Sequence, residues 1–275
     1  MNVWFVRLDC PAGQVAALAG LLDAVERDRA GRLAAVPRRR FVVAHGVLRM
    51  LVGWAAGVAP GAVRWRFGPL GKPEPDIPGP TLHVNLSTCA ELALIGISRA
   101  GPIGVDVERV NLDAPVVRWA GRFFPPADRA AVLTAPPASA AAVYFALWVR
   151  KEAWAKAQGL GVIDGLKVQT SRDQVPVCTI TTFPAPPGFA AAAASSAGLH
   201  QPADGTVDEC RIVGQDRPLQ PLQIRSRLDA EFGAQHGSGA AEHFERVTAP
   251  LRPVQGEHVH TAKFLAQRMA GGELL

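Results

Sequence analysis

Hydrophobic and polar positions follow two different periods along this chain, and the helical and strand-like periods appear in the same order twice. Apolar residues recur every three to four positions in long stretches, which predicts amphipathic helices. Shorter stretches alternate or are continuously apolar, which predicts strands. The predicted helices are 14–33, 38–56, 115–133 and 139–158, and the predicted strands are 3–8, 63–67, 82–86, 92–98, 103–108, 166–170, 177–182 and 189–194. Helices followed by strands, twice over, predict an α+β fold.

Two regions lack this patterning. Residues 68–80 are rich in Pro and Gly, so we expect a loop there. Residues 198–275 mix Pro, Gly, His and charged residues, and only 262–270 has helical spacing. We expect this extension to be mobile or loosely packed. Five of the seven histidines lie in it, but no further ligand has a spacing that would make a metal site with them.

The predicted strand 103–108 carries two carboxylates on one face. Residues two apart in a strand point the same way, so Asp106 and Glu108 lie together, while Val105 and Val107 point to the opposite face. Two neighbouring anions repel each other unless a cation or a hydrogen-bond donor lies between them. A solvated strand face is the ordinary alternative for such a pair.

The predicted helix 139–158 carries a third carboxylate and a lysine. Glu152 and Lys156 are four residues apart, so they share one face of the helix, and Gly159 and Gly161 suit its C-terminal end. A surface ion pair is the ordinary alternative. Together with the acidic strand, this helix predicts a magnesium site beside a cation, as chemistry on a phosphoanhydride requires.

These two segments, in this order, resemble motifs of the 4′-phosphopantetheinyl transferases of the type that activates surfactin synthetase. That family carries Gly-(Ile/Val)-Asp-(Ile/Val)-Glu and later Trp-x-x-Lys-Glu-(Ala/Ser)-x-x-Lys, and both motifs stand intact at 104–108 and 148–156. Further similar segments are the basic helix at 38–51, Gly-Lys-Pro at 71–73, Asn-Leu-Ser at 85–87, Arg-Phe-Phe at 122–124 and Pro-Gly-Phe at 187–189. The resemblance covers about residues 1–197.

The resemblance implies an α+β fold of two similar halves in a pseudo-twofold arrangement, with the active site in the cleft between them. The halves would be 1–102 and 103–197, and the family gives no role to the extension 198–275. The implied reaction is transfer of the phosphopantetheine arm of coenzyme A to a serine of an apo acyl, peptidyl or aryl carrier protein, with release of 3′,5′-ADP. A monomer is expected.

The resemblance also assigns roles to individual residues. Asp106, Glu108 and Glu152 would bind Mg²⁺, with Asp106 also beside the coenzyme A pyrophosphate. Glu152 would be a candidate base for the serine hydroxyl, and Lys156 would contact the α-phosphate and stabilise the leaving group. The nucleotide and its 3′-phosphate would be lined by Arg40, Lys72, Ser87 and Thr88. Cys89 and His83 are interpreted as structural.

Thr88 departs from the family pattern. The family places His directly after Asn-(Ile/Leu)-Ser, where it helps bind the 3′-phosphate, and this chain has Thr88 instead. A threonine hydroxyl donates a hydrogen bond but carries no positive charge. We therefore expect weaker recognition of the 3′-phosphate, with the metal-binding residues unaffected.

Charge and cysteine content agree with this hypothesis. The net charge is +5, and residues 1–197 carry 21 Lys and Arg against 14 Asp and Glu, so the basic surface lies in the part with the motifs. Such a surface suits an acidic docking helix on a carrier protein. The four cysteines lack CxxC spacing and are interpreted as reduced thiols of a cytoplasmic protein. Arg7 and Asp9 interrupt any signal-peptide-like run, and no apolar run is long enough to cross a membrane.

Two alternatives remain open at this point. The first is a degenerate coenzyme A-binding protein with weak or no transferase activity, which the substitution at Thr88 favours and the intact Asp106, Glu108, Glu152 and Lys156 oppose. The second is a metal-dependent enzyme that acts on another phosphoanhydride or on nucleic acid. No nucleic-acid-binding motif is present, and we expect neither a nucleic acid nor a membrane as partner.

Overall fold

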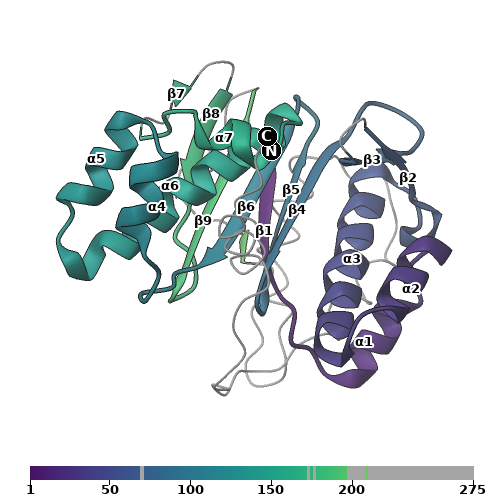
Figure 1. The fold of residues 1–275 in the computed structure, drawn as a ribbon. Coiled ribbons are helices and arrows are strands. Elements are labelled where there is room, and N and C mark those ends of the chain that lie inside the picture. Colours follow the sequence, from purple (N-terminus) through teal and green to yellow (C-terminus); the bar gives the residue numbers. More distant parts are fainter. Residues whose placement is uncertain (69–70, 172–173, 176–177, 197–207, 210–275) are drawn as a thin grey trace.

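The computed structural model describes residues 1–68, 71–171, 174–175, 178–196 and 208–209. They form an α+β fold in which two sheets lie between two groups of helices (Figure 1). The N-terminal part contains β1 (Asn2–Arg7), α1 (Ala12–Ala19), α2 (Ala24–Gly31), α3 (Ala35–Ala56), a 3-10 turn (Pro60–Ala62), β2 (Arg64–Phe67), β3 (Pro73–Asp76), β4 (His83–Cys89) and β5 (Leu92–Ser98). The C-terminal part contains β6 (Ile103–Arg109), α4 (Val116–Phe123), α5 (Pro126–Thr134), α6 (Pro137–Gln158), α7 (Val162–Leu166), β7 (Gln174–Val175), β8 (Cys178–Thr182) and β9 (Phe189–Ser195).

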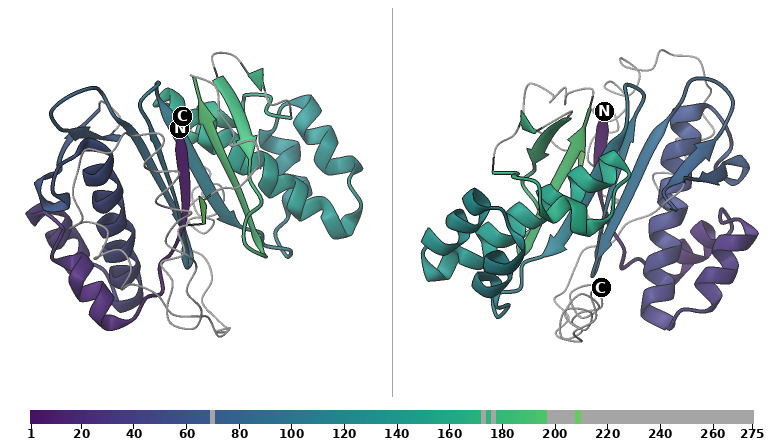
Figure 2. Two further views of the ribbon diagram at one scale, coloured as in Figure 1. Left: turned by 180° about the vertical axis from the view of Figure 1, so that it is seen from behind. Right: turned by 45° about the horizontal axis from the view of Figure 1, so that its top comes forward.

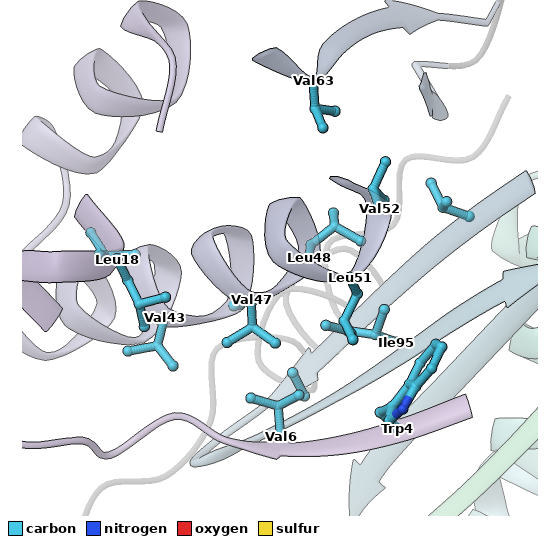
Figure 3. Packing of buried hydrophobic residues seen from close by; sticks show 14 of the residues in the cluster. Trp4, Val6, Leu18, Val43, Val47, Leu48, Leu51, Val52, Val63 and Ile95 are labelled. Atoms are coloured by element: carbon cyan, nitrogen blue, oxygen red, sulfur yellow. The ribbon is translucent and has the colours of Figure 1, made fainter. Parts of the chain in front are cut away.

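The N-terminal core lies between α3 and a sheet with the strand order β10-β1-β5-β4, in which β10 is the short segment Asp208–Glu209. Strand β1 alternates as its sequence predicts: Trp4 and Val6 join the α3 core, while Val3 and Phe5 point to the other face. Figure 3 shows Val47 and Leu51 of α3 packed toward β1 and Ile95 of β5. This packing holds β4 and β5 in place beside the second sheet.

The C-terminal core lies between α6 and a sheet with the strand order β6-β9-β8-β7. Helices α4 and α5 cover α6 on the side away from this sheet (Figures 1 and 2). Tyr144 of α6 stacks on Phe124, with ring centroids 4.8 Å apart. The small residues of β9 on the face toward α6, Ala190, Ala192 and Ala194, let the helix approach the sheet closely.

A third cluster of apolar side chains joins the two sheets face to face. Its members come from β1 and β5 on one side and from β6 and β9 on the other, namely Val3, Phe5, Leu94, Ile103, Val105, Val107, Ala191 and Ala193. At the margin of this cluster β4 and β6 run side by side in different sheets, joined through side chains of β4 rather than through a backbone ladder. Figure 2 shows the two sheets together, with one group of helices on each outer side.

Some of the predicted elements differ from the structure. The predicted helix 14–33 is two helices, because Asp23 forms an N-terminal capping box with Glu26 and starts α2 anew. The predicted helix 115–133 is also two helices, which are separated at Phe124 and Pro125. The prediction of a strand at 166–170 was wrong, since α7 ends at Leu166 and residues 167–170 form no strand. The predicted loop 68–80 contains the short strand β3.

The extension predicted for 198–275 lies outside the described residues, except for Asp208 and Glu209, which pair in parallel with Trp4 and Phe5 of β1. His258 and His260 also lie outside them. Within the described part of the chain, no helix is both long and apolar enough to span a membrane.

Candidate functional site

Gly104 lets helix α6 lie directly on strand β6. A Cβ atom at this position would be 2.0 Å from the carbonyl oxygen of Ala153 and 2.4 Å from the amide nitrogen of Ala157. These distances are too short for any side chain, so only glycine fits at residue 104. The next two residues on the same face of β6 are Asp106 and Glu108. The close approach therefore brings these two carboxylates against the turns of α6 that carry Glu152 and Lys156.

One carboxylate oxygen of Asp106 accepts two hydrogen bonds, and the other accepts none. Its Oδ1 accepts hydrogen bonds from Lys156 Nζ at 2.6 Å and from the Ser87 hydroxyl at 2.7 Å. Lys156 also lies 3.2 Å from Ser87 Oγ, so the three side chains form a closed triangle. Asp106 is 2% exposed, and its Oδ2 is buried with no hydrogen-bond partner in the structure. A buried polar atom without a partner is uncommon and points to a ligand or cation that completes it.

Three carboxylates act on one another at this site. Burial and, second to it, the nearby charge of Asp106 raise the pKa of Glu108 to about 7. The pKa of Glu152 is raised to about 7 for the same two reasons. Burial lowers the pKa of Lys156, but the carboxylates of Asp106 and Glu152 outweigh it and raise the pKa above its usual value. Lys156 therefore stays charged and is the cation that this anionic cluster now holds.

The donor set fits a divalent cation such as Mg²⁺, which prefers carboxylate oxygens. Among the described residues no group of three or more His, Cys, Asp or Glu side chains is already arranged around a common metal position. The fit rests on the unpartnered Oδ2 of Asp106 and on the electrostatic strain among Asp106, Glu108 and Glu152. A cation bound to that oxygen would relieve both.

A second buried network holds α6 itself. Lys151, which directly precedes Glu152, is 1% exposed and forms an ion pair with the fully buried Asp128 of α5. Asp128 also accepts the backbone N–H groups of Thr170 and Ser171, at 2.9 and 3.0 Å. Lys151 has no direct contact with the β6 carboxylates among the interactions described, so its role is to fix the helix that presents Glu152.

The residues predicted to line the nucleotide are dispersed. Lys72 donates to the backbone carbonyls of Ile103 at 3.0 Å and Lys156 at 2.7 Å, so it ties the N-terminal part to the C-terminal end of α6. Arg40 makes a two-pronged ion pair with Asp9, at 2.8 and 2.9 Å. Four residues were predicted to line the nucleotide, Arg40, Lys72, Ser87 and Thr88. Among them, only Ser87 contacts the carboxylate cluster.

Thr88 lies on the other face of β4 from Ser87, because successive strand residues alternate, and its side chain is exposed. His83 is half-buried at the start of the same strand. Burial and the charge of Lys72 lower the pKa of His83, so it is neutral at physiological pH.

The sequence interpretation missed the part that β4 plays. Asn85, Ser87 and Cys89 form a row along one face of β4, and each accepts a backbone N–H of β6. The Cys89 thiol also donates to Glu108 Oε2 at 3.1 Å, so Cys89 touches a residue of the cluster as well as supporting the fold. The available signal was the alternation of Asn85, Ser87 and Cys89 along the strand.

Comparison with known proteins agrees with these motifs. Residues 102–202 match the 4′-phosphopantetheinyl transferase superfamily. Over 191 residues the chain is 31% identical to the 4′-phosphopantetheinyl transferase HetI of Nostoc sp., covering 67% of this chain and 79% of that protein. A putative 4′-phosphopantetheinyl transferase of Synechocystis sp. is 28% identical over 167 residues, which is 60% of this chain and 67% of the relative. A 4′-phosphopantetheinyl transferase of Bacillus subtilis is 24% identical over 180 residues, or 63% of this chain and 78% of the relative.

Proposed function

The chain belongs to the 4′-phosphopantetheinyl transferase superfamily and is a transferase, and from this premise we propose that it moves the phosphopantetheine arm of coenzyme A to a serine of an apo carrier protein. The observation that carries the proposal is the triangle of Ser87, Asp106 and Lys156, with one oxygen of Asp106 buried and unpartnered. The proposed active site lies in a cleft between two similar halves, 1–102 and 103–197, related by a pseudo-twofold arrangement.

The proposed reaction breaks one phosphoanhydride bond and forms one phosphoester bond. The serine oxygen attacks the β-phosphorus, the bond from this phosphorus to the bridging oxygen breaks, and 3′,5′-ADP leaves with the α-phosphate. The serine proton passes to Glu152, directly or through a water. Catalysis of this kind depends mainly on positioning and on charge stabilisation.

Asp106, Glu108 and Glu152 would hold Mg²⁺, which when bound neutralises charge on the pyrophosphate oxygens. The ammonium of Lys156 stays protonated and would stabilise the negative charge that develops on the leaving α-phosphate. Ser87 keeps Asp106 oriented while Lys156 turns toward the substrate. Lys72 fixes the end of α6, and Arg40, Lys72 and Thr88 are proposed on the nucleotide side.

The test is incubation of the protein with coenzyme A, Mg²⁺ and an apo carrier protein, followed by intact-mass measurement of the carrier. We expect the carrier mass to rise by one phosphopantetheine arm and to stay unchanged when Mg²⁺ is chelated. A carrier whose serine is replaced by alanine is the matched control. Binding of coenzyme A without any change in carrier mass would favour the degenerate coenzyme A-binding protein over the transferase.

A further inference from the structure

The seam between β4 and β6 is built from side chains that replace a backbone ladder. We define the seam as three contacts: Asn85 Oδ1 with Val105 N at 2.8 Å, Ser87 Oγ with Val107 N at 3.4 Å, and Cys89 Sγ with Arg109 N at 3.3 Å. The register is constant, because the two partners of each contact are twenty positions apart in the sequence. Strand β6 pairs with β9 on its other edge, so these three N–H groups would otherwise lack partners in a largely buried position.

Two of the three seam residues also donate a hydrogen bond to a carboxylate. Ser87 donates to Asp106 Oδ1, and Cys89 donates to Glu108 Oε2. Each of these side chains accepts the N–H of the residue that follows its carboxylate and donates to the carboxylate itself. Asn85 caps Val105 in the same way but has no carboxylate neighbour, since the corresponding position on β6 is Gly104.

The position of Cys89 is held from both strands. The residue after it, Ala90, has a left-handed backbone with φ of 51° and makes the tight turn into β5. Glu91 in that turn forms an ion pair with Arg109, the residue whose amide Cys89 accepts. The thiol is therefore anchored before any ligand binds, as a group that orients a carboxylate must be.

We propose that Cys89 is a positioning residue whose thiol holds Glu108 in reach of the divalent cation that Asp106 and Glu152 also bind. This inference rests on the proposed function for the identity of the cation. In this proposal the contact at Cys89 serves the metal site, while the contact at Asn85 serves only the fold.

The experiment compares Cys89→Ala, Cys89→Val, Cys89→Ser and Asn85→Ala with the unaltered protein, all as full chains. Binding of Mn²⁺ is measured by electron paramagnetic resonance of the free ion, with coenzyme A present and no carrier protein. Thermal unfolding is measured on the same samples. Cys89→Ala and Asn85→Ala each remove one cap from a β6 amide, and of the two only Cys89→Ala also removes a contact with Glu108.

Cys89→Ala and Cys89→Val should weaken Mn²⁺ binding about 10-fold, the lower end of what loss of a group orienting a metal ligand costs. Cys89→Ser keeps both the donor and the acceptor and should bind within about threefold of the unaltered protein. Asn85→Ala should unfold at a lower temperature and keep the original Mn²⁺ affinity.

Unchanged Mn²⁺ affinity in folded Cys89→Ala or Cys89→Val would overturn the inference, and so would an equal loss in Asn85→Ala or the absence of Mn²⁺ binding by the unaltered protein. The outcome for the proposed function is separate. If the carrier protein is never modified but the Mn²⁺ affinities follow the expected order, the transferase proposal fails and the positioning role of Cys89 stands. If the carrier is modified and the affinities do not differ, only the positioning role fails.

Discussion

Helices α3 and α6 each pack against the sheet of their own part of the molecule, but of the two only α6 contributes side chains to the carboxylate cluster. Each is 22 residues long, packs on the sheet of its own part and ends at a glycine with positive φ, Gly57 at 70° and Gly159 at 67°. Each also contains a cation that is almost completely buried: Arg49 is 0% exposed and Lys151 is 1% exposed. The two helices therefore share a structural plan, and their difference lies in where their polar side chains find partners.

The polar network of α3 is closed within the N-terminal part. The Arg49 guanidinium donates to Asp23 at 2.5 Å, to Glu26 at 2.6 Å and to the carbonyls of Pro60 and Val63. Helix α6 has a comparable closed network at Lys151. It also carries Glu152 and Lys156, which face β6. There, one buried carboxylate oxygen remains without a partner. A closed network stabilises the fold, and an incomplete one leaves room for a ligand.

The largest effect should come from breaking the closed network of α3. Arg49→Met leaves Asp23 and Glu26 without their buried cation, and removal of one partner from such a pair costs about 3–5 kcal/mol. Urea unfolding should show this loss, while the residual folded protein should still transfer phosphopantetheine. Arg32→Met is the control, since its exposed ion pair with Asp28 contributes about 0–1 kcal/mol. A loss for Arg49→Met no larger than for this control would contradict the comparison.

Substitutions in the carboxylate cluster that α6 forms with β6 should have the opposite effect: they should reduce transfer and leave the protein folded. Asp106→Ala should reduce transfer at least about 10²-fold, the scale of losing a principal electrostatic group, and Glu152→Ala should do the same. Both proteins should remain folded by circular dichroism. Asp28→Ala removes an exposed carboxylate from α2 and should leave the rate unchanged. Full activity of Asp106→Ala in Mg²⁺ would rule out its assignment.

The stability of the protein should depend on pH in acid, because Glu26 of the network around Arg49 becomes protonated there. Burial raises the pKa of Glu26, but hydrogen bonds from His45 and Arg49 outweigh it and hold the pKa below its usual value. Since the folded pKa is the lower one, the stabilisation is fully present above the unfolded pKa of about 4.3 and is lost as pH falls through the folded pKa.

Glu26→Gln should therefore be less stable than the unaltered protein by about 1.5–3 kcal/mol near neutral pH, with the difference shrinking in acid. Urea unfolding over a series of pH values measures it. Asp128, whose pKa Lys151 and the Thr170 amide hold below the usual range despite burial, is the matched site in the C-terminal part. A difference between Glu26→Gln and the unaltered protein that does not change with pH would exclude this linkage.

The smallest effect concerns Thr88, whose exposed side chain makes any new interaction weak. Thr88→His should lower the apparent KM for coenzyme A below neutral pH, where imidazole is more often charged, and should barely change it for 3′-dephospho-coenzyme A. Steady-state kinetics with both substrates measures this. Equal changes for the two substrates, or no change for either, would mean that residue 88 does not face the 3′-phosphate.

The sequence by itself determined the α+β class, the family and the pairing of chemical groups along each element. Period two placed Asp106 and Glu108 on one face of a strand, and the i, i+4 spacing placed Glu152 and Lys156 on one face of a helix, because both relations are local. The breaks at Asp23 and Pro125 were missed because apolar spacing continues across them, although each has a local signal, the Asp23-x-x-Glu26 capping pattern and the pair Pro125-Pro126.

Only the tertiary structure decided which of these groups meet. The contact at Gly104, the partners of Lys72 and the seam from β4 join residues up to 84 positions apart, and local periodicity contains no information on such distances. Cys89 reads as an ordinary small core residue until β6 lies beside it and brings Glu108 to its thiol. Long-range packing decides these relations because buried N–H, carboxylate and ammonium groups find most of their partners on distant segments of the chain.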